Sequence, residues 1–120
     1  MTRDELREKL SNIKIKIIEC KSKLIILTES KKEVGEQISE IKKIISLEIA
    51  EEVDPFGKPM FSNQVKRDGE LFLRLSEHSK YNTLLDDYSR LEKEIGEYQL
   101  ILESAQYDFR IEEILSRYCD

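Results

Sequence analysis

The side chains that could carry chemistry are few, and their spacing matches no catalytic or metal-binding set. His78 is the only histidine. Glu77 directly precedes it in sequence, and Asp86 and Asp87 follow it. A catalytic base needs a positioned partner and a pocket, and the Glu-x-x-His spacing of carboxylate-bridged metal sites in helical bundles is absent. Phosphate loops, nucleophile motifs and Rossmann glycine patterns are also absent. We therefore expect a protein that is not an enzyme and has no cofactor, with His78 in or beside a helix–helix seam.

The two cysteines, Cys20 and Cys119, stand 99 residues apart and form neither a metal-ligand pair nor a disulfide framework. Cys20 falls on an apolar helical phase, where a thiol acts as a small hydrophobic group. Cys119 is next to the last residue, and we expect it to be exposed. A disulfide between the Cys119 residues of two copies is possible only if an oligomer brings them together.

The composition favours long helices over a compact globule. Charged residues make up 38% of the 120 residues and apolar ones 39%, with no Trp and four Gly. Helices that bury one stripe and solvate the rest need no fuller apolar interior. The net charge of −5 disfavours a general nucleic-acid binder. The charged start MTRDELREKL and the lack of an 18-residue apolar run predict a single-domain cytoplasmic protein that does not enter a membrane.

Apolar residues recur at alternating steps of four and three, interrupted only at Lys31. This spacing keeps one seam on one side of a helix. The first half carries Leu6, Leu10, Ile13, Ile17, Cys20, Leu24, Leu27, Val34, Ile38, Ile41 and Ile45, and the second carries Tyr81, Leu84, Tyr88, Leu91, Ile95, Tyr98, Leu102, Ala105 and Phe109. The pattern predicts an all-α fold, a long antiparallel two-helix coiled-coil hairpin. We expect helix 1 over about 2–52, a turn over 53–62, and helix 2 over about 63–118 with a stutter near 75–81.

One pairing of the two seams aligns them throughout. It places Leu6 opposite Phe109 and Leu27 opposite Tyr88, and it leaves the last turns from Ile111 onward beyond the end of helix 1. The same pairing sets Lys21 against Glu94 and Lys23 against Glu92. The centre of the hairpin then falls between Gly57 and Lys58, within the stretch that holds both prolines.

We therefore interpret the sequence DPFGKPMFSN, residues 54–63, primarily as the turn of the hairpin. Asp54 before a proline ends the first helix, Gly57 can take positive φ, and Ser62 or Asn63 can cap the next helix. Four side chains are candidates for an interaction tip: Phe56, Lys58, Met60 and Phe61. The apolar members of this set either plug the end of the seam or form a recognition surface for another protein.

Apolar residues outside the seam predict self-association. They are Ile15, Ile18, Ile25 and Ile26 in helix 1, and Leu100, Ile101, Ile111, Ile114 and Leu115 in helix 2. A second apolar stripe on each helix is typical of a bundle of more than two helices. We expect a homodimer or tetramer in which hairpins pack through these residues, most simply with two-fold symmetry.

The segment Lys14–Lys32 holds six lysines and two glutamates. Two interpretations stand: a solvated helix face whose lysines pair with the acidic second helix, or a face that binds nucleic acid. Residues 1–53 carry 11 basic and 11 acidic side chains, and residues 63–120 carry 8 and 13. This charge asymmetry favours the first interpretation.

The run Gly57-Lys58-Pro59-Met60-Phe61-Ser62-Asn63, with Lys66-Arg67 and Asp108-Phe109-Arg110 downstream, resembles small uncharacterised coiled-coil hairpin proteins of prokaryotes and their phages. The resemblance implies a hairpin architecture and, as a hint, a companion role in phage or mobile-element nucleic-acid metabolism; it brings no site residues. In length and layout the chain is also similar to prefoldin beta-type chaperone subunits. It differs from them in the connector, where those subunits place β-hairpins. The resulting expectation is a structural or interaction module that binds itself and a partner protein of unknown identity.

Overall fold

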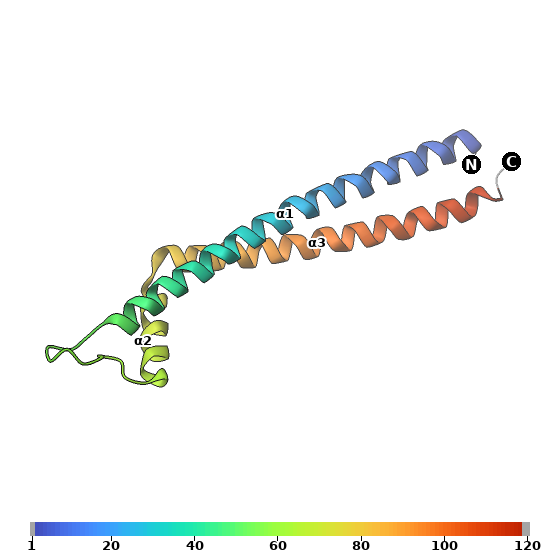
Figure 1. Cartoon of the computed structure of the whole chain (residues 1–120). Coiled ribbons are helices and arrows are strands. Elements are labelled where there is room, and N and C mark those ends of the chain that lie inside the picture. The colour runs from blue at the N-terminus through green and yellow to red at the C-terminus, as the bar shows by residue number, and fades with distance from the viewer. Residues whose placement is uncertain (1, 119–120) are drawn as a thin grey trace. The chain divides into compact units, whose positions relative to one another are not determined.

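The structure, a computed structural model, describes residues 2–118 of the chain. It contains α1 (Arg3–Glu51), α2 (Gln64–Glu77) and α3 (Ser79–Ser116) (Figure 1). The described residues form no strand, and their only β-pairing is an isolated antiparallel bridge between Val53 and Pro59. The predicted all-α helical hairpin is confirmed, and α1 ends within a residue of the predicted bounds.

Contacts divide the chain into two compact units. The terminal unit consists of Met1–Ser30 with Leu91–Asp120, and the loop unit consists of Lys31–Arg90. In the terminal unit the first part of α1 packs antiparallel against the later part of α3. In the loop unit the rest of α1 packs with α2 and with the first turns of α3.

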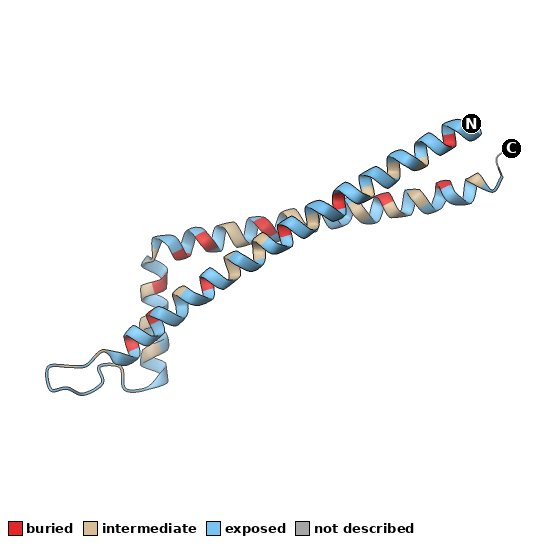
Figure 2. Cartoon of the chain, turned by 45° about the horizontal axis from the view of Figure 1, so that its top comes forward, coloured by how far each residue is buried: buried red, intermediate tan, exposed pale blue. Residues whose placement is uncertain are grey.

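The membership of the seam is confirmed in both units. Every seam residue named above is buried or half-buried, while the positions beside it on each helix are mostly exposed (Figure 2). In the terminal unit the buried apolar side chains are Leu6, Cys20, Leu27, Leu91 and Ala105. A step of four and three residues keeps these side chains on one helix face, which explains the red bands of Figure 2.

The predicted pairing of the two seams is wrong by about one heptad, roughly seven residues. Phe109 lies against Lys14, whose ammonium nitrogen is 5.7 Å from the ring centre, rather than against Leu6. In the loop unit a Cβ added at Gly35 would meet Tyr88 Cε2 at 3.5 Å, whereas Tyr88 was predicted opposite Leu27. The slip leaves the seam intact, because residues seven apart share a face.

The slip also brings the end of α3 into contact with α1. Glu112 is buried, and its Oε1 lies 2.6 Å from Lys9 Nζ. The other carboxylate oxygen, Oε2, is buried without a hydrogen-bond partner. The prediction that the last turns extend beyond α1 is therefore wrong at this position. Glu112 continues the four-and-three spacing from Ala105 and Phe109. Because its side chain is charged, a search for apolar residues does not find it.

The single helix predicted over 63–118 is interrupted at His78. The backbone of His78 is extended, with φ −82° and ψ 106°. Its Nδ1 accepts a hydrogen bond from the Tyr81 amide at 3.0 Å, so the imidazole caps the start of α3. Asn82 Nδ2 lies within hydrogen-bond distance of the carbonyls of Leu75, Ser76 and His78, at 3.3, 3.1 and 2.9 Å. The predicted stutter is thus a break with its own caps, because side chains satisfy the backbone groups that the break exposes.

The other helix starts are also capped. Thr2 and Glu5 exchange two hydrogen bonds, with the Thr2 amide donating to Glu5 Oε2 and the Glu5 amide to Thr2 Oγ1. This reciprocal capping box satisfies two amides at the first turn of α1. Asn63 caps α2 by accepting from the Lys66 amide at 2.9 Å, which confirms one of the two predicted capping residues.

The loop unit has one continuous apolar interior to which α1, α2 and α3 contribute. Its buried members are Ile38, Ile45, Ile49, Leu75, Tyr81 and Leu84, and Val34, Ile41, Phe61, Leu71 and Tyr88 pack against them. Ile49 is the most deeply buried side chain of the set, with 1% of its surface exposed. Three elements around one cluster hold this unit together.

Candidate interaction surfaces

The turn between α1 and α2 is a hydrogen-bonded structure built around Asp54. Asp54 Oδ1 accepts from the amides of Phe56 and Lys58, at 2.8 and 2.9 Å. The Asp54 amide donates to the Lys58 carbonyl at 2.7 Å, and the Gly57 amide to the Asp54 carbonyl at 3.0 Å. Gly57 has a φ of 78°, as predicted, which a residue with a side chain would adopt only with strain. The turn is therefore held by the Asp54 side chain together with backbone hydrogen bonds.

The four tip candidates fall into two groups. Phe61 is half-buried and packs against the apolar interior of the loop unit. Phe56 is 88% exposed, and Lys58 and Met60 are also exposed. The plug interpretation thus describes Phe61, while the other three side chains face solvent from a preorganised turn.

Arg74 of α2 fixes the base of this turn. Its guanidinium lies 2.7 Å from Glu52 Oε2 and 2.8 Å from Glu70 Oε1, and its centre is 5.9 Å from the centre of the Phe61 ring. The hydrogen bond from Arg74 lowers the pKa of Glu52 below its ordinary value, and both carboxylates raise the pKa of Arg74. Arg67 Nε donates to the Phe61 carbonyl at 3.0 Å. Two arginines of α2 therefore tie Phe61 and the end of α1 together.

The nine predicted interface residues are all exposed. The exposed fractions of Ile15, Ile18, Ile25, Ile26, Leu100, Ile101, Ile111, Ile114 and Leu115 lie between 39% and 68%. All nine belong to the terminal unit. On α1 the four isoleucines occupy the helix face opposite Cys20 and Leu24, since each residue turns the helix by about 100°. On α3 Leu100, Ile111 and Ile114 likewise lie opposite the seam residues Leu102 and Ala105.

The lysines of Lys14–Lys32 are exposed except for Lys31, which is half-buried. Lys14 lies over the Phe109 ring, and Lys31 Nζ is 5.1 Å from the centre of the Tyr88 ring. The ion pairs predicted for Lys21 and Lys23 with Glu94 and Glu92 do not form, because the seams are paired one heptad away. Within residues 2–118 no ion pair joins Lys16, Lys21 or Lys23 to a carboxylate.

Sequence reasoning missed an exposed apolar face on α2. Val65, Phe72 and Leu73 are exposed by 82%, 72% and 56%. Gly69 lies between them in sequence, and a Cβ added there would meet no atom within 4 Å. The seven-residue spacing between Val65 and Phe72 could have indicated this face. The prediction instead followed Leu71 and Leu75, which continue the apolar pattern on a shifted helical phase.

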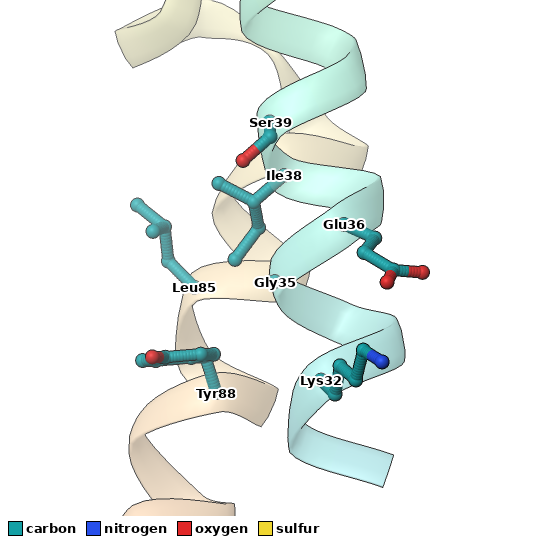
Figure 3. A pocket seen from close by; sticks show the side chains of 7 residues that line it. All are labelled: Lys32, Gly35, Glu36, Ile38, Ser39, Leu85 and Tyr88. Carbon is teal, nitrogen blue, oxygen red and sulfur yellow. The ribbon is translucent and has the colours of Figure 1, made fainter. Parts of the chain in front are cut away.

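A hollow of about 580 Å³ lies in the loop unit, between α1 and α3. Figure 3 shows the Ile38 side chain of α1 directed toward Leu85 of α3, and the Tyr88 ring lies beside Gly35. Its polar lining consists of Lys32, Glu36 and Ser39. This set offers no base with a positioned partner, and the hollow is an open apolar groove beside the seam.

The Nδ1 of His78 serves as a helix cap, and the ring also lines a hollow of about 340 Å³ with Glu48 and Arg74. Among the described residues no group of three or more His, Cys, Asp or Glu side chains is placed to hold a metal ion. Cys20 is buried in the seam as predicted, and Cys119 lies outside the described residues. Nor does any helix within residues 2–118 have the length and apolar character needed to cross a membrane.

Comparison of the chain with protein-family models, curated proteins and solved structures finds no match. The resemblances suggested by the loop sequence and by the hairpin layout therefore remain predictions. Functional inference rests on the surfaces described above.

Proposed function

We propose that this chain is a non-enzymatic interaction module that associates with copies of itself through the outer faces of the terminal unit and presents its turn to a partner protein. The observation that carries the proposal is the exposure of Ile15, Ile18, Ile25 and Ile26, between 51% and 62% each, on the side of α1 that faces away from α3. Four isoleucines exposed on one helix face mark an unfilled packing surface.

The energetic scale supports association. Full burial of an isoleucine side chain contributes about 1.5–3 kcal/mol relative to full exposure. The side chains on the α1 face have about half of that left to gain, so eight such residues across an interface contribute roughly 8 kcal/mol. Association costs about 4–15 kcal/mol in lost translational and rotational freedom. The apolar gain is therefore comparable to this cost and offsets it toward the lower end of the range.

Two aspartates on the α1 face test the self-association. We expect Ile18→Asp with Ile25→Asp to reduce the particle mass measured by light scattering, because each charge would have to be desolvated in the interface. Ser39→Asp with Ser46→Asp is the matched control, since both serines are exposed on the same helix with the same spacing of seven. Equal mass losses in both variants, or none in either, would contradict the assignment of this face.

The turn is the part of the module that we assign to the partner protein. Its backbone is held by Asp54 before any partner binds, so Phe56 and Lys58 lose little conformational freedom on docking. Phe56→Ser should leave the unfolding temperature unchanged, whereas Phe61→Ser should lower it. If Phe56→Ser destabilises the chain as much as Phe61→Ser, the turn is a structural plug and not a contact surface.

A second candidate function is nucleic-acid binding by the Lys14–Lys32 face. The observation in its favour is that Lys16, Lys21 and Lys23 are exposed and have no carboxylate partner among residues 2–118. Binding through phosphate contacts must weaken steeply as salt concentration rises. Absence of DNA and RNA binding at low salt would remove this candidate. The layout shared with prefoldin subunits gains no support from the turn, whose single bridge is not a β-hairpin pair.

A further inference from the structure

The outer face of α1 in the terminal unit has a basic border. Its apolar residues are Ile15, Ile18, Ile25 and Ile26, and the exposed lysines beside them are Lys14, Lys16, Lys21 and Lys23. Counted from the apolar seam, these lysines fall at the two heptad positions that flank it, so they line both edges of the outer face. Glu19 is the one acidic side chain between residues 14 and 26. The border therefore carries a net charge of about +3.

The outer face of α3 in the same unit has the opposite border. Its apolar residues include Leu100, Tyr107, Ile111 and Ile114, and the exposed acidic residues around them are Glu97, Glu103, Asp108 and Glu113. Arg110 is the one basic side chain between residues 97 and 115. This border carries about −3. The two outer faces are thus alike in apolar content and opposite in charge.

The opposite charges of the two borders determine which outer faces can pack together. If two copies packed α1 against α1 about a two-fold axis, lysines would face lysines; α3 against α3 would bring carboxylates together. Like charges across an interface oppose association and unlike charges favour it. The outer face of α1 in one copy and the outer face of α3 in another avoid this conflict.

We propose that copies of this chain associate through unlike faces, with the outer isoleucine face of α1 in one copy packed on the outer face of α3 in the next. The inference rests on the proposed self-association and replaces the two-fold packing that the sequence suggests. Because the two faces lie opposite the seam on different helices, each bound copy leaves one face of each kind free at the ends. Such heterologous contacts build open chains or closed rings instead of stopping at a dimer.

Two variants, each with one face blocked, test the inference. The first carries Ile18→Asp and Ile25→Asp on α1, and the second carries Leu100→Asp and Ile111→Asp on α3. Circular dichroism and thermal unfolding of each variant establish that the helices are retained. We expect each variant alone to have the mass of one chain. An equimolar mixture should form a particle of two chains, because the first variant keeps its α3 face and the second keeps its α1 face.

Other outcomes separate failure of the inference from failure of the proposed function. If the second variant still associates with itself while the first does not, the contact joins α1 to α1, and the unlike-face inference is wrong although self-association stands. The converse result assigns the contact to α3 with α3. If both variants retain the mass of the unchanged chain, copies meet elsewhere. A single-chain mass for the unchanged protein overturns both proposals.

Charge reversal tests the opposite borders. Lys16→Glu with Lys21→Glu removes the positive charge of the α1 border, and we expect this double variant to weaken the association. Adding Asp108→Lys and Glu113→Lys in the same chain should restore the association, because the two borders then carry opposite charges again. Failure of this restored variant to recover would contradict the contact between unlike faces.

Discussion

The terminal unit and the loop unit are built from the same kind of helix, but they differ in what surrounds their interior. In the loop unit three helices enclose one apolar cluster, and its arginines and Asn82 are hydrogen-bonded. In the terminal unit two helices share a single seam, and a buried carboxylate oxygen of Glu112 lacks a partner. The outer faces of both helices there remain apolar and exposed.

This difference indicates where each unit obtains its stability. The loop unit encloses its apolar cluster with three helices of the same chain, although Val65, Phe72 and Leu73 of α2 remain exposed. The terminal unit has a narrow interior and two unfilled faces, so its stability should depend on neighbouring copies.

The largest effect should come from removing the most buried side chain of the loop unit. We expect Ile49→Ala to lower the free energy of unfolding by about 2–5 kcal/mol, because it leaves a cavity in a three-helix interior. Ile18→Ala is the matched exposed control and should change the stability of the single chain by less than about 0.5 kcal/mol. Denaturant unfolding at low protein concentration measures both. Equal losses in the free energy of unfolding would contradict the distinction between the buried Ile49 and the exposed Ile18.

A smaller loss is expected from Arg74→Met, which removes the contacts to Glu52 and Glu70 and keeps much of the apolar stem. Because the pKa of Glu52 is lowered in the folded chain, its interaction with Arg74 stabilises the fold above the ordinary pKa of the carboxyl. This stability is lost as pH falls through the folded pKa. The gap in unfolding temperature between the unchanged chain and Arg74→Met should therefore be present at pH 7, begin to narrow near the ordinary carboxyl pKa of about 4.3, and close once pH falls below the folded pKa of Glu52. A gap that stays constant with pH would contradict the role of Glu52.

Glu112→Leu should act in the opposite direction in the terminal unit. The substitution removes a buried carboxylate oxygen without a partner and extends the apolar seam, and we expect a gain of about 1 kcal/mol in the free energy of unfolding. Lys9→Met, which leaves the carboxylate buried and unpaired, should destabilise the chain. If Glu112→Leu lowers the free energy of unfolding more than Lys9→Met does, then the Lys9–Glu112 ion pair stabilises the register by more than the burial of the carboxylate costs.

The smallest effects belong to the glycines. Gly69 and Gly96 lie within helices, and a Cβ at either would meet no atom within 4 Å. Each change to Ala should add about 0.5–1 kcal/mol of stability through helix propensity alone. Gly57→Ala should destabilise the turn, because Gly57 has a φ of 78°. Thermal unfolding of the three single variants provides the comparison, and a loss at Gly69 or Gly96 would reveal a close contact at that position.

The membership of the seam was predictable, and its register was not. Apolar spacing identifies which residues face inward, because burial selects the same residues in any register that differs by whole heptads. Sliding Phe109 from Leu6 toward Lys14 keeps every apolar residue on the seam. The distinguishing contact is the pair of Lys9 with Glu112, and an apolar search passes over both.

Two features of the candidate surfaces also depended on the structure. The break at His78 needs a ring nitrogen and the Asn82 amide in the right places, which a pattern of residue types does not specify. Phe56 and Phe61 are equally apolar in sequence, and only the hydrogen bonds of Asp54 and the position of Arg74 place one outside and the other inside. The exposed isoleucines, by contrast, followed directly from their helical phase.

The most direct test of the account is the solution mass of the unchanged chain, measured by multi-angle light scattering over a range of protein concentrations. Self-association through the terminal unit predicts an average mass above that of one chain, and association through unlike faces predicts that it rises further with concentration. A mass equal to one chain at micromolar concentration and above would contradict the central claim.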